Sequence, residues 1–245
     1  MAGDELAWRA EAACRDAWPC DHEIVRNGWL IRASGGATRR TNSINPLSGT
    51  RAGIETVLDE ARAVYAGRGQ SLMVRVPDIA GEMDADLTRF GFAPGAGETA
   101  TLYARLGEVA LGSAAQIGPL DAEWLAARAR AIGWNAAEMA VYRQMLGLVA
   151  GPIVYAAARD EGEIGAVAYG AIAHGLLVVE SVVTDARYRR RGLARRVVAA
   201  LLDWGRGQGA AEACLQVTAD NVAAVSLYRG LGFTQELYRY HYRTA

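Results

Sequence analysis

The tetrapeptide Gly-Arg-Gly-Gln occurs twice in the sequence, at residues 67–70 and 205–208, a separation of 138 positions. Each copy ends a helical pattern and precedes a stretch typical of a strand. At the same separation Ser43 matches Ser181, and a Gly-Phe pair recurs before the closing strand of each half. Self-similarity at a fixed spacing indicates a duplicated unit. We therefore expect a tandem duplication of one fold.

Helical and strand patterns alternate along both halves, which predicts an α/β protein. In the first half we expect a helix from Asp4 that Pro19 ends, strands at 28–33, 42–47, 71–76 and 99–106, and helices at 54–66 and 83–89. In the second half we expect helices at 121–132, 136–149, 194–205 and 221–232, and strands at 152–159, 164–172, 176–183, 213–218 and 233–243. A weakly patterned stretch, 107–115, separates them, so we expect domains at 1–110 and 116–245.

The overall charge and the cysteines narrow the function classes. The formal net charge is -1, and arginine supplies all the basic charge because the sequence contains no lysine. The 3 cysteines lack the spacing of a metal site, so we expect ordinary thiols and no metal. No stretch approaches the length of a membrane span, and the start lacks the apolar core of a signal peptide. We expect a cytoplasmic protein that does not bind membranes.

The segment 185–196 carries six arginines around a single glycine, Gly192. Arginines suit the first turn of an ordinary helix poorly, because that end of a helix favours anions. A nucleic-acid patch is the second interpretation, but the segment has Tyr188 as its lone aromatic residue and the protein has no basic excess. The third is a phosphate-binding turn between a strand and a helix, where unpaired N–H groups and a small residue admit an anion. We favour the third.

Two motifs resemble the signatures of the GCN5-related N-acetyltransferase (GNAT) superfamily. Residues 189–194, Arg-Arg-Arg-Gly-Leu-Ala, are similar to its R-x-x-G-x-G/A motif. Residues 221–228 followed by Leu-Gly-Phe at 231–233 are similar to its second signature, N-x-x-A-x-x-L-Y-x-x-L-G-F. The resemblance covers residues 116–242. It implies a splayed mixed β-sheet flanked by helices in each domain, and acetyl-CoA bound between two strands of the second.

The resemblance also implies roles for individual residues in direct acetyl transfer to an amine. Backbone groups of Val182 and Val183 would pair with the pantetheine arm, and the amides around Arg190 to Arg195 would hold the pyrophosphate. The full set of expected cofactor-binding residues is Val182, Val183, Arg189, Arg190, Arg191, Gly192, Leu193, Ala194, Arg195, Asn221 and Tyr228.

The reaction needs a base for the amine and an acid for the leaving thiolate. Tyr228 is the candidate acid; alternatively it only packs its helix against the sheet. Glu180 is the candidate base because it stands among apolar residues just before the expected cofactor site. Whether Glu180 faces that site or the outer face of the sheet is open. We expect His174 to be a surface residue and Asp185 to shape the loop.

The first half lacks the corresponding chemistry. At the repeat spacing, Gly192 corresponds to Ile54 and Glu180 to Asn42, and alignment on the Gly-Phe pair puts Leu87 opposite Tyr228. We therefore expect a degenerate first domain without a cofactor site. It would pack against the second domain and help to form the acceptor site, or serve as an oligomer interface in a homodimer.

Five residues are candidates for contact with the acceptor. The polar segment 35–46 is either an ordinary hairpin or a substrate-facing loop. The candidates in it and beyond it are Arg39, Arg40, Asn42, Trp134 and Glu138. The sequence thus predicts an N-acetyltransferase for a small-molecule or peptide amine. A non-catalytic acyl-CoA sensor or partner-binding module is the alternative, and the identity of the amine is open.

Overall fold

A computed structural model describes residues 2–36, 38–108 and 115–245 of the chain. Its strands join into one continuous sheet in the order β1-β2-β3-β4-β11-β5-β10-β9-β8-β7-β6. The strands are β1 (His22–Arg26), β2 (Trp29–Ala33), β3 (Ser43–Pro46), β4 (Met73–Pro77), β5 (Ala96–Arg105), β6 (Gln116–Gly118), β7 (Ile153–Asp160), β8 (Glu163–Ala173), β9 (Leu176–Thr184), β10 (Glu212–Thr218) and β11 (Gln235–Thr244). This mixed sheet, flanked by helices, agrees with the expected fold class.

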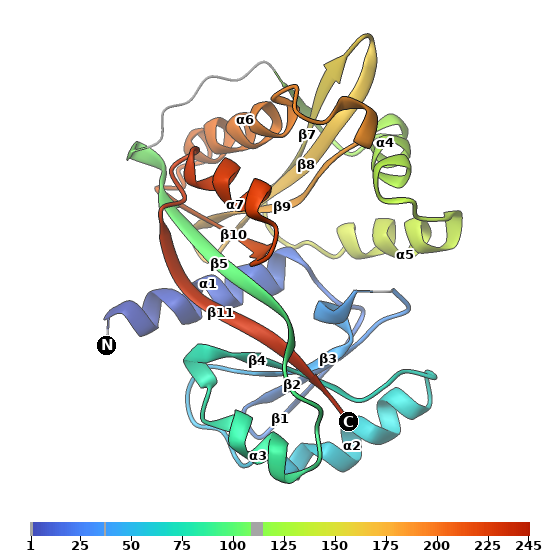
Figure 1. Cartoon of the computed structure of the whole chain (residues 1–245), viewed down its shortest axis with the longest axis vertical. Helices are drawn as coiled ribbons and strands as arrows, with labels where there is room; N and C mark the ends of the chain where they lie inside the picture. The colour runs from blue at the N-terminus through green and yellow to red at the C-terminus, as the bar shows by residue number, and fades with distance from the viewer. Residues whose placement is uncertain (1, 37, 109–114) are drawn as a thin grey trace.

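Helices cover the sheet within each half and at the junction of the halves (Figure 1). They are α1 (Ala2–Ala17), α2 (Glu55–Ala66), α3 (Met83–Arg89), α4 (Ala122–Ile132), α5 (Ala136–Leu146), α6 (Leu193–Gly207) and α7 (Val222–Arg229). Asp121 accepts a hydrogen bond from the Trp124 backbone and caps α4. Most of the expected boundary segment 107–115 falls outside the described residues. No helix in the described part of the chain has both the length and the apolarity that a bilayer crossing requires.

The two halves exchange a strand at the centre of the sheet. Strand β5, from the first half, pairs antiparallel with β10, and β11, from the second half, pairs antiparallel with β4. β5 and β11 also pair with each other, and they run between the upper and lower parts of the molecule in Figure 1. In each half a parallel pair, β3–β4 or β9–β10, is followed by a strand from the other half. This internal symmetry supports the predicted duplication.

Helix α1 lies across the junction and contacts β8, β9, β10 and β11. Its buried face consists mainly of small side chains, Ala7, Ala10, Ala13 and Ala17, which allow a close approach to the sheet. Glu11 on the same helix makes a bidentate ion pair with Arg75 of β4. Burial opposes ionisation of Glu11, but Arg75 and the Tyr238 hydroxyl outweigh it and lower the pKa of the carboxyl. The helix therefore joins the first half to strands of the second through packing and through the hydrogen bond that Tyr238 of β11 donates to Glu11.

Candidate active site

Strands β9 and β10 separate where the candidate base lies. They pair in parallel from Leu176–Glu212 to Val179–Leu215, and the pairing ends before Glu180. In the β8–β9 ladder the register shifts next to Glu180, and Ser181 has a φ of 59°. A β-bulge of this kind adds a residue, bends the strand and interrupts its ladder. The sheet is thus splayed at this point.

A cleft of about 800 Å³ opens between the separated strands. Its walls come from β9, the loop after it, the start of α6, β10 and α7, with additions from α4 and from the first half. Most of the expected site residues line it: Glu180, Val182, Val183, Arg189, Arg190, Gly192, Leu193, Ala194, Arg195, Asn221, Tyr228 and Arg40. The sequence motifs on three elements therefore meet in one cleft.

The start of α6 offers unpaired backbone donors to the cleft. Gly192 precedes the helix with a φ of 74°, a conformation that glycine adopts without the penalty other residues incur. No side chain caps this helix, and the first N–H groups of a helix have no carbonyl partner of their own. The N-terminus therefore presents N–H groups and the positive end of the helix dipole, a combination that binds phosphates.

The arginines of this loop divide into two groups. In the described residues Arg189 and Arg190 make no ion pair, and both line the cleft. Arg191 instead pairs with Asp160 and Glu161 and does not line the cleft. Two cations are thus available to an anionic ligand.

Asp185 fixes the start of the loop. Its carboxylate accepts hydrogen bonds from the backbone and the side chain of Arg187, at 2.8–3.1 Å. These hydrogen bonds, the side-chain one foremost, lower the pKa of Asp185 to about 2. The aspartate shapes the loop, as the sequence analysis expects.

Helix α7 supplies Asn221 and Tyr228. The Asn221 side chain caps the helix by accepting a hydrogen bond from the Ala224 backbone at 3.1 Å. Tyr228 is buried with its ring edge-on to Phe233, and it still lines the cleft. Burial, reinforced by the negative charge of Glu180, raises the pKa of Tyr228 above its usual value. The phenol therefore keeps its proton at neutral pH.

Glu180 lines the cleft and pairs with an arginine from the first half. Both oxygens accept hydrogen bonds from Arg40, at 2.6 and 2.9 Å. The Arg40 guanidinium also lies 4.3 Å from the Trp18 ring centre and donates to Gln216 at 3.2 Å. Burial alone would lower the pKa of Arg40, but Glu180 outweighs it and raises that pKa. A side chain of the first half, Arg40, thus contacts the candidate base directly.

The other candidate acceptor contacts lie elsewhere. Arg39 packs against the Tyr242 ring, 5.5 Å from its centre. Asn42 holds its own loop together, accepting hydrogen bonds from the Ser34 backbone and the Gln70 side chain. Neither of these two residues lines the cleft.

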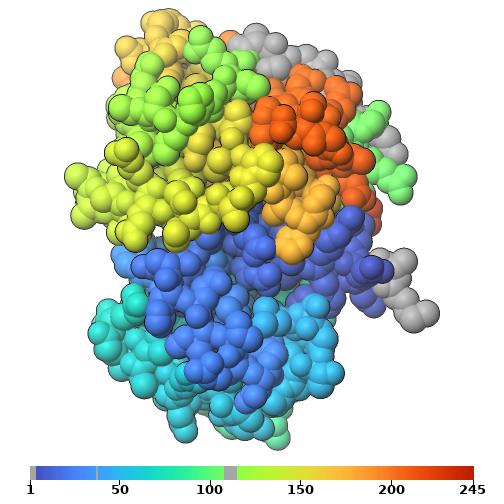
Figure 2. Space-filling view, turned by 180° about the vertical axis from the view of Figure 1, so that it is seen from behind, coloured from blue at the N-terminus to red at the C-terminus, as the bar shows by residue number. Residues whose placement is uncertain are grey.

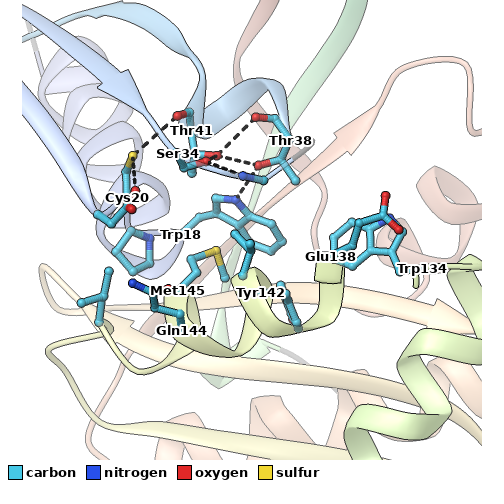
Figure 3. A pocket seen from close by; sticks show the side chains of 15 residues that line it. Trp18, Cys20, Ser34, Thr38, Thr41, Trp134, Glu138, Tyr142, Gln144 and Met145 are labelled. Carbon is cyan, nitrogen blue, oxygen red and sulfur yellow. Dashed lines mark hydrogen bonds between the residues drawn. The ribbon is translucent and has the colours of Figure 1, made fainter. Parts of the chain in front are cut away.

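Trp134 and Glu138 line a second, smaller pocket between the halves (Figure 3). It lies where the yellow-green segment of α5 meets blue segments of the first half (Figure 2). Trp18, Tyr142 and Met145 form much of its wall, and Trp18 also lines the main cleft. Glu138 accepts a hydrogen bond from the Asn135 backbone and completes the cap of α5.

Trp18, Arg128 and Gln216 also line the cleft, although none of them was among the expected site residues. Each belongs to an ordinary helical or strand pattern, without a motif around it. The one signal for Arg128 is its position on the buried face of α4, because a buried arginine is rare unless its charge is paired. His174 lies in a turn, is exposed and pairs with Asp16, as expected of a surface residue.

Comparison with known proteins identifies the family and agrees with the fold. A family described as "Probable histone acetyltransferase Rv0428c C-terminal" matches residues 8–243. "N-alpha-acetyltransferase RimI" of Mycobacterium tuberculosis is 40% identical over 68 residues, 27% of this chain and 41% of its own. The Escherichia coli "[Ribosomal protein bS18]-alanine N-acetyltransferase" is 37% identical over 62 residues, 25% of this chain and 42% of its own. The chain thus spans less than half of these curated relatives.

Solved structures extend the likeness to nearly the whole chain. A GCN5-related N-acetyltransferase from Kribbella flavida superposes with a TM-score of 0.71 at 18% identity, covering 97% of this chain and 94% of that one. A tandem GNAT protein from the clavulanic acid biosynthesis pathway superposes with a TM-score of 0.66 at 13% identity, covering 100% and 94%. The chain belongs to the Rv0428c C-terminal acetyltransferase family, and it has the fold of GCN5-related N-acetyltransferases.

Proposed function

We propose that this protein is an acetyl-CoA-dependent N-acetyltransferase with one cofactor site, in the second half. The observation that carries the proposal is the cleft between β9 and β10, with the uncapped start of α6 at its wall. Its donor set fits a CoA thioester. The N–H groups at the start of α6 and two arginines that make no ion pair in the described part of the chain suit the phosphates. The interrupted strand suits the amide-containing arm. Bound acetyl-CoA would supply an activated acetyl group.

The residues of the chain divide the work of binding. The amides that follow Gly192, with Arg189 and Arg190, would hold the phosphates. Backbone groups of Val182 and Val183, freed where the strands part, would hydrogen-bond the pantetheine amides. Asn221 would donate from its amide nitrogen, because its oxygen already caps α7.

Glu180 and Tyr228 would move the protons. Glu180 would accept a proton from the amine; its bidentate pairing with Arg40 leaves further lone pairs on both oxygens. Tyr228 would donate its phenolic proton to the departing thiolate. A buried phenol with a raised pKa is protonated at neutral pH, as an acid must be.

The pairing of Glu180 with Arg40 also favours a second candidate function, a non-catalytic acyl-CoA sensor or partner-binding module. A carboxylate held by a guanidinium is less free to act as a base. Such a protein would bind acetyl-CoA and release no thiol with any amine. Turnover therefore separates the two functions, whereas binding alone does not.

The test is calorimetric titration of acetyl-CoA into the wild-type protein and into Gly192→Asp. We expect one site per chain and at least a ~100-fold loss of affinity in the variant, because a side chain at φ 74° is strained and a carboxylate repels phosphate. Ala52→Asp, at an exposed position two residues before Ile54, the counterpart of Gly192, is the control and should leave affinity unchanged. Thiol release with a panel of amines then measures turnover. Tight binding to Gly192→Asp would overturn the proposal.

A further inference from the structure

Arg128 of α4 is a buried cation that has no carboxylate partner among the residues that the structure describes. It is 5% exposed and lines the main cleft. The other buried arginines of the described residues each pair with an acidic side chain: Arg32 with Glu23, Arg75 with Glu11 and Arg243 with Asp84. A buried charge is costly unless it is paired. Arg128 lines the cleft, so a bound ligand could supply the negative charge that the protein does not.

The surroundings of Arg128 are aromatic and neutral. Its guanidinium lies 4.3 Å from the Tyr142 ring centre and 5.2 Å from that of Trp134. One nitrogen donates to the Ser181 carbonyl at 3.3 Å, and the buried Nε has no partner among the described residues. Burial raises the pKa of Tyr142, so that phenol stays neutral. Cation–π contacts offset only part of the cost of burying the charge.

The charges around the bulge of β9 do not balance. Arg40 and Arg128 contribute two positive charges and Glu180 one negative charge, which leaves one positive charge in a region of low dielectric. The phosphates of acetyl-CoA would bind at α6, and its thioester is neutral. The second reactant, the amine, is therefore the natural source of a balancing anion.

We propose that the acceptor amine carries a carboxylate and that Arg128 binds it; this rests on the proposed acetyltransferase function. A guanidinium recognises a carboxylate through paired N–H groups, and Arg128 has donors to spare. Arg128 donates a hydrogen bond to the carbonyl of Ser181, the neighbour of Glu180. An acceptor whose carboxylate binds Arg128 would therefore hold its amine beside the candidate base. A free amino acid carries an amine and a carboxylate on the same carbon atom, so the two groups could reach neighbouring residues of the cleft.

The experiment compares matched acceptors: glycine, leucine and phenylalanine, each as the free acid and as the amide. Thiol release from acetyl-CoA is measured at pH 8. For at least one pair we expect the acid to have a kcat/KM at least ~10-fold above that of its amide, the size of one charge-assisted hydrogen bond. Equal rates, or faster reaction of every amide, would overturn the inference.

Variants test whether Arg128 carries this preference. Arg128→Gln should lose the preference for the acid, mainly through a raised KM, while calorimetry shows unchanged acetyl-CoA affinity. Arg128→Lys should retain part of it, because the charge remains without the guanidinium fork. Arg130→Gln removes a half-exposed arginine of the same helix and should behave as wild type. Arg128→Gln with its preference intact would overturn the inference.

The remaining outcomes are equally decisive. If succinyl-CoA replaces acetyl-CoA with a higher kcat/KM and Arg128→Gln abolishes that gain, the anion belongs to the acyl donor and the inference fails. If acetyl-CoA binds and neither the acids nor the amides react, the inference fails while the cofactor site stands. If acetyl-CoA does not bind, the proposed function itself fails.

Discussion

The two halves share three successive strands, a helix, a strand, a second helix and a closing strand, and they differ at the start of the first of these helices. Helix α6 follows Gly192, whose φ of 74° leaves the first N–H groups open to the cleft. Helix α2 follows Ile54, which has helical dihedral angles and is 1% exposed. A Cβ at the adjacent Gly53 would collide with the carboxylate of Glu55, so the protein's own anion lies near this helix start. A duplicated fold can thus persist without its phosphate site.

The two halves also differ in the pairing of their parallel strands and in the side chains at the positions of the candidate base and acid. β9 and β10 pair over four residues before they part, whereas β3 and β4 pair at Ile44 and Val74. Glu180 lines the cleft, and its counterpart Asn42 holds a loop together. Leu87, opposite Tyr228 in the alignment, is fully buried in the core of the first half. We infer that the first half serves as a scaffold and that its residues Arg40 and Trp18 complete the wall of the cleft in the second half.

The largest effect on turnover should come from Glu180→Gln, which removes the proposed base. We expect kcat to fall by about 10²- to 10⁴-fold, the usual contribution of a positioned acid or base. Acetyl-CoA affinity, measured by calorimetry, should stay within about twofold, because the phosphates would bind at α6. Asn42→Ala is the matched change in the first half. It should lower the melting temperature and leave kcat nearly unchanged; the reverse pattern would break the comparison.

A local segment predicted most of the residues that line the cleft. The glycine, the arginines and the strand before them are encoded within about fifteen residues, so chain geometry alone brings them together. Arg191 departs from the expectation because the β7–β8 turn brings Asp160 and Glu161 within reach of it. Such a contact depends on the packing of two turns.

Contacts between the halves could not be predicted in this way. Arg40 and Glu180 are 140 residues apart in the chain and meet because α1 and the exchanged strands fix the halves together. The polar pattern 35–46 indicated a functional loop without indicating which side chain reaches the site. The aromatic setting of Arg128 likewise depends on how α4 and α5 pack.

The next effect concerns Tyr228, which the first half replaces by leucine. Tyr228→Phe should lower kcat by roughly 10- to 100-fold, at the lower end for a general acid, because water can protonate a thiolate in its place. The acid works only when protonated, and burial raises its pKa, so its ionisation should not reduce wild-type activity up to about pH 10. Rate profiles from pH 6 to 10 measure this. A wild-type decline near pH 8 that Tyr228→Phe lacks would contradict it.

The smallest effect should come from Asp185, which holds the loop rather than a reactant. Its pKa is lowered in the folded protein, so the stabilisation is present above the unfolded value of about 3.9 and is lost as the pH falls through about 2. Asp185→Asn should therefore lower the melting temperature at pH 7, and the difference from wild type should shrink towards pH 2. Acetyl-CoA affinity should weaken only about threefold, because Gly192 and the start of α6 remain. Asp59→Asn, an exposed aspartate on α2, is the control; an equal loss of affinity there would mean that the loop geometry at Asp185 does not matter for binding.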